Sequence, residues 1–124
     1  MPNPVLHFEI PVTDMDRAVA FYHAVFGYDL RRETVDGYDM AFFPRDDDQP
    51  GASGALAKGD VYKPSHDGVI IYFDVPDIDA VLARAEASGS KILYAKTDLG
   101  AAGFVAEIED SEGNRIALTQ AQAV

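Results

Sequence analysis

The chain lacks cysteine altogether, and this absence removes several kinds of chemistry. Without thiols there is no disulfide framework, no cysteine nucleophile and no thiolate metal site. The sequence also has no apolar run near the roughly 18 residues that a membrane-spanning helix needs. Its N-terminus lacks the basic patch and hydrophobic stretch of a secretory signal. We therefore expect a cytoplasmic protein that has no membrane as its partner.

Positive charge is scarce. Ten Lys and Arg residues stand against 21 Asp and Glu residues, which gives a formal net charge of −11. Such a surface repels the phosphates of nucleic acids and anionic lipids, so we do not expect a nucleic-acid partner. The acidic excess mainly favours solubility, although it would also attract a cationic ligand.

Familiar catalytic motifs are missing as well. The glycines do not form a phosphate cradle between a strand and a helix, and there is no Gly-x-Ser-x-Gly or His-Glu-x-x-His sequence. A functional prediction must therefore come from the architecture rather than from a local motif.

The first half of the sequence begins with a strand and a helix. In residues 5–12, Leu6, Phe8 and every second residue after them are apolar, which is typical of a strand with one face in a core. Asp14 and its neighbours can start a helix, which Gly27 ends. Three strand-like segments follow, at residues 29–33, 38–43 and 54–58.

The second half repeats this order. A strand is expected at residues 69–75, followed by a helix that begins near Asp77 and ends at Gly89, and by strands at residues 91–94, 104–108 and 115–119. A shift of 63 residues places residues 12–16 on residues 75–79. We therefore predict one domain over residues 1–124, with an internal repeat of residues 5–58 and 69–120. With 48% hydrophobic residues, the chain can form a real core.

Three stretches within this duplicated frame carry a family resemblance: residues 7–15, the aromatic residues between 21 and 28, and residues 110–118. Together they resemble the vicinal oxygen chelate family of glyoxalases, extradiol dioxygenases and bleomycin-resistance proteins. The resemblance implies an α+β fold in which two βαβββ modules form a cupped eight-stranded mixed sheet with helices on its convex side. Many single-domain relatives dimerise, so a homodimer is expected.

The resemblance also identifies four positions where metal-dependent members place ligands. In this sequence they are His7, Ala55, Ile70 and Ala117. Only the histidine has a lone pair to offer, and one imidazole does not hold a catalytic metal. We therefore expect no cofactor. The less favoured alternative is a divalent metal held by His7 and Glu9, which share one strand face.

Other side chains on the cup face are candidates for ligand binding. Polar and aromatic ones would orient or grip a ligand, and small ones would make room for it. The predicted ligand-binding residues are His7, Glu9, Tyr38, Met40, Phe42, Ala55, Ala57, Ile70, Tyr72, Arg115 and Ala117. Each also has a purely structural alternative: a dimer interface for residues 38–42, and a rim position or a pair with Glu9 for Arg115.

Three functions remain open. The favoured one is a metal-independent protein that binds or sequesters a small organic ligand in the cup, as bleomycin-resistance proteins do. The second is a lyase, isomerase or dioxygenase that uses His7 and Glu9, with or without a metal. The third is a module that mainly dimerises or modifies a partner protein.

Overall fold

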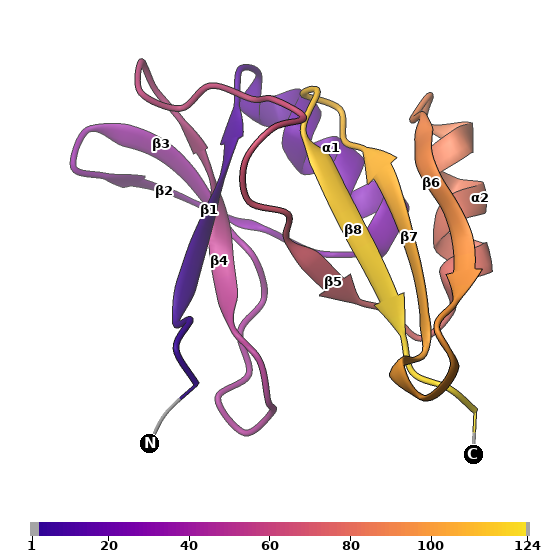
Figure 1. Ribbon diagram of the computed structural model, residues 1–124. Coiled ribbons are helices and arrows are strands. Elements are labelled where there is room, and N and C mark those ends of the chain that lie inside the picture. Colours follow the sequence, from indigo (N-terminus) through magenta and orange to yellow (C-terminus); the bar gives the residue numbers. More distant parts are fainter. Residues whose placement is uncertain (1–2, 124) are drawn as a thin grey trace.

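The structure is a computed structural model that describes residues 3–123, so residues 1, 2 and 124 of the predicted domain lie outside it. Eight strands form two four-stranded mixed sheets, and two α-helices accompany them (Figure 1). The predicted α+β architecture is thus confirmed, with the eight strands divided between two open sheets.

The first module forms the first sheet, in the strand order β1-β4-β3-β2. β1 runs parallel to β4, and the other neighbours are antiparallel. Its elements are β1 (His7–Val12), α1 (Met15–Phe26), β2 (Arg31–Val35), β3 (Tyr38–Phe42) and β4 (Ser53–Lys58).

The second module forms the second sheet in the equivalent order, β5-β8-β7-β6. Again the first strand is parallel to the last, and the others are antiparallel. Its elements are β5 (Tyr72–Asp74), α2 (Ile78–Ala87), β6 (Ile92–Asp98), the 3₁₀ turn η1 (Gly100–Ala102), β7 (Phe104–Glu109) and β8 (Arg115–Gln120).

Both helices begin as the sequence predicts, and at repeat-related positions. Asp14 accepts a hydrogen bond from the backbone N–H of Arg17, and Asp77 accepts one from that of Ala80. Each aspartate thus satisfies a backbone N–H that has no partner within its helix. Gly27 ends α1 in the left-handed conformation, with φ of +78°.

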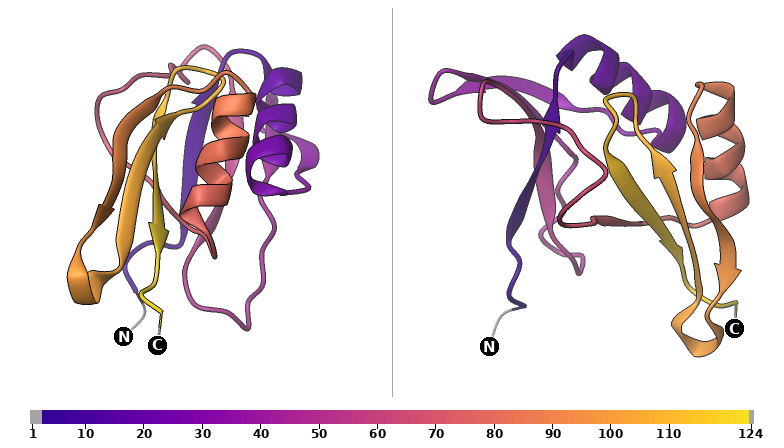
Figure 2. Two further views of the ribbon diagram at one scale, coloured as in Figure 1. Left: turned by 90° about the vertical axis from the view of Figure 1, so that its right-hand side faces the viewer. Right: turned by 45° about the horizontal axis from the view of Figure 1, so that its top comes forward.

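One hydrophobic core joins the two modules. The helices pack against each other on the same side of the sheets (Figure 2). Phe73 of β5 lies at the junction, because its ring contacts those of Phe8 and Phe43 from the first sheet and of Tyr22 from α1. We call the sheet faces that contribute to this core the helix faces, and the opposite ones the open faces.

Several predicted strand bounds were wrong. β1 starts at His7 rather than at residue 5, and Leu6, predicted to lie on the core face of this strand, is 71% exposed. The strand predicted over residues 69–75 is paired only over Tyr72–Asp74. β2 lies at residues 31–35 instead of 29–33. The differences fall at the ends of strands. At β1 and β5 the apolar pattern continues beyond the paired backbone, whereas the polar β2 offers no pattern that sets its bounds.

Neither helix within residues 3–123 is long and apolar enough to cross a membrane.

Candidate functional site

The register of the first sheet places seven predicted site residues on one face. Glu9 lies opposite Ala55 across β1 and β4, Phe42 lies opposite Ala55 across β3 and β4, and Met40 lies opposite Ala57. Because side chains alternate along a strand, residues two apart share a face. The open face of the first sheet therefore carries His7, Glu9, Tyr38, Met40, Phe42, Ala55 and Ala57.

The second sheet carries three of the remaining predicted residues on its open face. Tyr72 of β5 lies opposite Ala117 of β8, and Arg115 shares the face of Ala117. Ile70 lies outside β5 and is half-buried. The cavity of about 430 Å³ that His7 lines includes none of these four residues. A different cavity, of about 380 Å³, is lined by both Glu9 and Arg115.

The two modules match in register as well as in order. Glu9 lies opposite Ala55 in the first sheet, and Tyr72 lies opposite Ala117 in the second. Glu9 and Tyr72 are separated by the same 63 residues that separate Asp14 from Asp77. Ala55 and Ala117, which the resemblance identified as ligand positions, are thus structurally equivalent.

A polar cluster occupies the open face of the first sheet and is centred on Glu9. One carboxylate oxygen accepts a hydrogen bond of 2.8 Å from the hydroxyl of Tyr62, and the other lies 3.4 Å from Nε2 of His7. The side chains of His7 and Glu9 are 41% and 34% exposed, so a ligand can reach both. The pKa of Tyr62 is raised by this hydrogen bond, then by burial and by the charge of Glu9. The phenol therefore remains a donor at neutral pH.

Sequence reasoning missed Tyr62. It lies in the connection between β4 and β5, where no periodic pattern shows which way a side chain points. Its ring packs edge-on against Tyr38, with centroids 5.4 Å apart. Gly59 allows this arrangement, because a Cβ at that position would lie 2.3 Å from the Tyr38 ring. The only signal in the sequence was an aromatic residue shortly after a glycine.

The alanines of this face do not line an open cavity. Met40, Ala55 and Ala57 form a small buried cluster, and Tyr38, Phe42 and Tyr62 pack over it. Ala117 of the second sheet is also fully buried. A ligand on the first sheet would therefore contact the aromatic rings and the Glu9 cluster before it reached an alanine methyl group.

Two polar side-chain pairs occupy the open face of the second sheet. Arg115 pairs with Glu107 on the neighbouring strand, so Glu9 is not its partner. His66, from the connection that precedes β5, lies 2.6 Å from a carboxylate oxygen of Glu109. This face is thus polar and internally paired. The open face of the first sheet also carries an ion pair, between Arg31 and Glu33, with the Arg31 guanidinium 4.9 Å from the centroid of the Phe42 ring, in addition to the Glu9 cluster and its aromatic rings.

The side chains do not fit a catalytic metal. Of the four ligand positions that the resemblance identified, three are aliphatic, at Ala55, Ile70 and Ala117. His7 and Glu9 alone leave most of the coordination sphere without protein ligands. Within residues 3–123, no group of three or more His, Cys, Asp or Glu side chains is arranged to hold an ion.

Comparison with known proteins agrees with this architecture. A family model for the glyoxalase/bleomycin resistance protein/dioxygenase superfamily matches residues 5–118. No curated protein matches the sequence. Among solved structures, a glyoxylase/bleomycin resistance protein/dioxygenase domain from Frankia sp. EAN1pec superposes with a TM-score of 0.75 at 17% identity, covering 98% of this chain and all of that one.

Two further structures represent different activities on this fold. An antibiotic-binding protein from Streptomyces sp. CB03234 has a TM-score of 0.68 at 23% identity, with 98% of each chain covered. A trypanothione-dependent glyoxalase I from Leishmania major has a TM-score of 0.72 at 26% identity, covering 96% of this chain and 87% of that one.

Proposed function

Because the chain belongs to the glyoxalase/bleomycin resistance protein/dioxygenase superfamily, we propose that it binds a small organic ligand on the open face of its first sheet, without a metal. One observation carries this proposal. The carboxylate of Glu9 is held between Tyr62 and His7 and remains partly exposed beside aromatic rings. The face thus offers both a polar anchor and an apolar surface.

The chemistry of this cluster favours a cationic ligand. Glu9 is the charged group at its centre, and two donors already hold the carboxylate in place. The adjacent rings of Tyr38 and Tyr62 can pack against the apolar part of a ligand, and their negative faces attract cations. The net charge of −11 raises the local concentration of cations around the whole protein.

Relatives support a binding function. The superfamily name includes bleomycin resistance, and one structural neighbour is an antibiotic-binding protein. Sequestering a ligand requires no metal and no catalytic group, which suits a face whose expected metal positions are aliphatic.

Calorimetric titration with metal-free bleomycin, a cationic glycopeptide, tests the proposal. We expect binding that weakens with added salt, and an affinity about tenfold lower for Glu9→Gln. Tyr62→Phe should bind more weakly than the wild type. Asp60→Asn is the matched control, because it removes an exposed charge from the same connection and its side chain makes no hydrogen bond or ion pair within residues 3–123. Equal affinities for Glu9→Gln and the wild type would contradict the proposed site.

Metal independence needs its own measurement. We expect less than stoichiometric metal in protein purified without a chelator or an affinity tag, and unchanged bleomycin affinity after treatment with a chelator. Stoichiometric metal that is lost in His7→Ala would overturn this part of the proposal.

A second candidate function is catalysis by His7 and Glu9. Their 3.4 Å contact favours it, because a carboxylate can orient an imidazole for proton transfer. The test is turnover of the methylglyoxal–glutathione adduct and of catechol, alone and with added divalent metals. Turnover lost in a folded His7→Ala variant would establish an enzyme, and no turnover under any of these conditions would remove this candidate.

We also propose that the protein acts in the cytoplasm as a homodimer. Apolar side chains are exposed beside the strands at the junction of the modules, including Leu6, Val69 and Tyr72. Their burial between two copies would remove apolar surface from water. Sedimentation at micromolar concentration should show a species of twice the 13.4 kDa chain mass, and a monomer would contradict the dimer. A module that mainly dimerises or modifies a partner would show the dimer but bind no ligand.

A further inference from the structure

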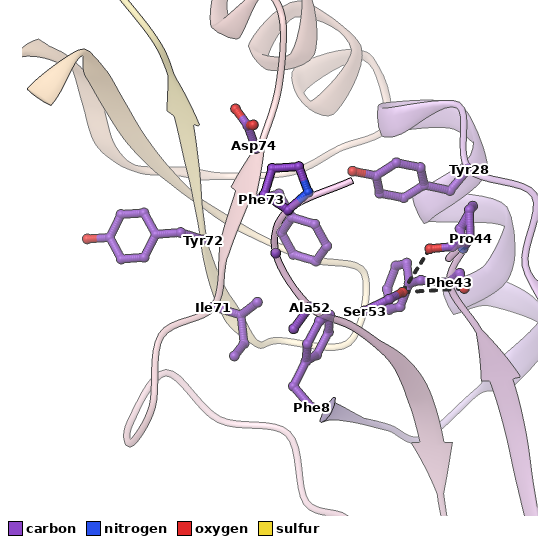
Figure 3. Close-up of a pocket in the computed structure, with 12 residues that line it drawn as sticks. Phe8, Tyr28, Phe43, Pro44, Ala52, Ser53, Ile71, Tyr72, Phe73 and Asp74 are labelled. Atoms are coloured by element: carbon purple, nitrogen blue, oxygen red, sulfur yellow. Dashed lines mark hydrogen bonds between the residues drawn. The ribbon is translucent and has the colours of Figure 1, made fainter. Parts of the chain in front are cut away.

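A second cavity lies between the modules, away from the Glu9 cluster. Its volume is about 420 Å³, and its lining includes Phe8, Phe43 and Phe73 (Figure 3). These three residues lie on the helix faces of their sheets, whereas Glu9 lies on the open face of the first. We call this cavity the inter-module pocket. Its volume falls within the range of about 300–1,000 Å³ that is typical of small-molecule sites.

Five aromatic residues line the inter-module pocket, and four of their rings lie together, whereas the ring of the fifth, Tyr72, points away from them (Figure 3). Phe43 and Phe73 are buried, and their centroids lie 5.7 Å apart. Phe8 lies 5.7 Å from Phe43, and Tyr28 approaches Phe43 at the same distance from the other side. Phe8 and Tyr28 are only half-buried, so these rings border the cavity. Such a lining suits a flat aromatic ligand.

Two polar groups without hydrogen-bond partners in the described part of the chain lie at one side of the pocket, the carboxylate of Asp74 and the hydroxyl of Tyr28. Asp74 of β5 is exposed, and within residues 3–123 its carboxylate makes no hydrogen bond or ion pair. The hydroxyl of Tyr28 extends toward β5, and within the same range it has no hydrogen-bond partner either (Figure 3). Burial and then the charge of Asp74 raise the pKa of Tyr28, which is consistent with their proximity.

Among the residues that the structure describes, no lysine or arginine lines this pocket. Asp74 is therefore a carboxylate at the edge of an aromatic cavity with no cation from the pocket lining to balance it. We propose that the inter-module pocket binds a flat aromatic cation, with the rings of Phe8, Phe43 and Tyr28 against its apolar part and Asp74 beside its positive charge. This site is separate from the one proposed on the open face of the first sheet.

The probe that tests this inference is 1-naphthylmethylamine, with the uncharged 1-naphthylmethanol as its matched ligand. Calorimetry should show that the amine binds more tightly than the alcohol. Asp74→Asn should lower the affinity for the amine about tenfold and leave the affinity for the alcohol unchanged. Glu86→Gln, which removes an exposed charge from α2, should leave the affinities for both ligands unchanged. Because Asp74 is exposed, the Asn variant should retain its melting temperature, which circular dichroism checks.

Two further results separate this pocket from the site at Glu9. Glu9→Gln should leave the amine affinity unchanged if the inter-module pocket is correct. Loss of amine binding in Glu9→Gln but not in Asp74→Asn would overturn the inference and assign the amine to the open face. Absence of amine binding, or burial of Asp74 and Phe8 by a second copy in a crystal structure, would overturn it as well.

Discussion

Tyr22 of α1 donates a 2.8 Å hydrogen bond to Asp110, which follows β7 in the other module. Both side chains are buried. Asp110 also accepts hydrogen bonds from the backbone N–H groups of Glu112 and Asn114 and from the side chain of Asn114. The last of these residues donates in turn to the carbonyl of Pro11. The turn between β7 and β8 therefore ties the second module to the first.

Loss of this hydrogen bond should destabilise the protein. Tyr22→Phe keeps the ring but removes one donor from a buried carboxylate, so we expect the free energy of unfolding to fall by about 1–2 kcal/mol. Urea denaturation measures this change. Tyr94→Phe is the control, because that tyrosine is 45% exposed and makes no hydrogen bond through its hydroxyl within the described residues. Similar losses in both variants would contradict the role of Asp110 as the acceptor.

The same turn holds the N-terminus of α1 through Glu112. Its carboxylate accepts from the backbone N–H groups of Thr13 and Asp14 and from the guanidinium of Arg17. Burial alone would raise the pKa of Glu112, but the hydrogen bonds, chiefly the one from Arg17, lower it from 4.5 to about 2. The charged form is therefore the one that stabilises the fold.

This shift predicts a pH dependence. A carboxyl group with a lowered pKa contributes stability above its unfolded pKa, and the contribution is lost as the pH falls through its folded pKa. At pH 7 the free energy of unfolding of the wild type should exceed that of Glu112→Gln by about 2 kcal/mol. This figure already includes a reduction, because solvent around the exposed Arg17 screens the interaction. The difference should shrink between about pH 4.5 and pH 2, measured by urea denaturation at several pH values.

The control for this prediction is Glu86→Gln, an exposed charge change on α2. The free energy of unfolding of this variant should depend on pH in the same way as that of the wild type. Asp110 titrates in both proteins, so its effect largely cancels in the comparison. A difference between wild type and Glu112→Gln that stays constant down to pH 2 would show that Glu112 acts by shape rather than by charge.

Gly54 permits the close approach of β1 and β4. A Cβ at this position would lie 2.1 Å from the carbonyl oxygen of Phe8, which is backbone and cannot turn away. Gly54→Ala should therefore lower the free energy of unfolding by about 2–3 kcal/mol, or prevent folding. Thermal unfolding measures this change. Gly59→Ala should cost less, because its Cβ meets the movable ring of Tyr38. Equal stability of Gly54→Ala and wild type would contradict the strand packing.

The two helix starts offer a smaller, well-defined prediction. The side chain of Asp77 caps α2 by accepting from the backbone N–H of Ala80, and within residues 3–123 this side chain makes no other hydrogen bond. Asp77→Ala should lower the free energy of unfolding by about 1 kcal/mol. Asp77→Asn should lower the free energy of unfolding by less, since an amide oxygen can also accept this hydrogen bond. The two variants would have equal stability if the cap contributed nothing.

Periodic segments explain what could be predicted from the sequence. The shared spacing of Asp14 and Asp77 located both helix starts. Alternation placed Glu9 on the open face, and the resemblance placed Ala55 there, where it lies opposite Glu9. Alternation failed at Leu6, because an apolar side chain beyond the last paired residue has nothing to pack against.

The connections explain what could not be predicted. Tyr62 and Glu112 lie between strands, where side-chain direction depends on the local turn and not on a period. Their partners, Glu9 and Arg17, are 53 and 95 residues away in sequence. Only the packing of one module on the other brings the second pair together, so the sequence pattern carried no signal for it.

The central claim is that ligands bind beside Glu9 on the open face of the first sheet. The most direct measurement is a ¹H–¹⁵N NMR titration of the protein with metal-free bleomycin. We predict saturable shifts in the amides of residues 7–9 and of Tyr62, with residues 71–74 of the inter-module pocket changing less. Shifts confined to residues 71–74, or no shifts at all, would contradict the account.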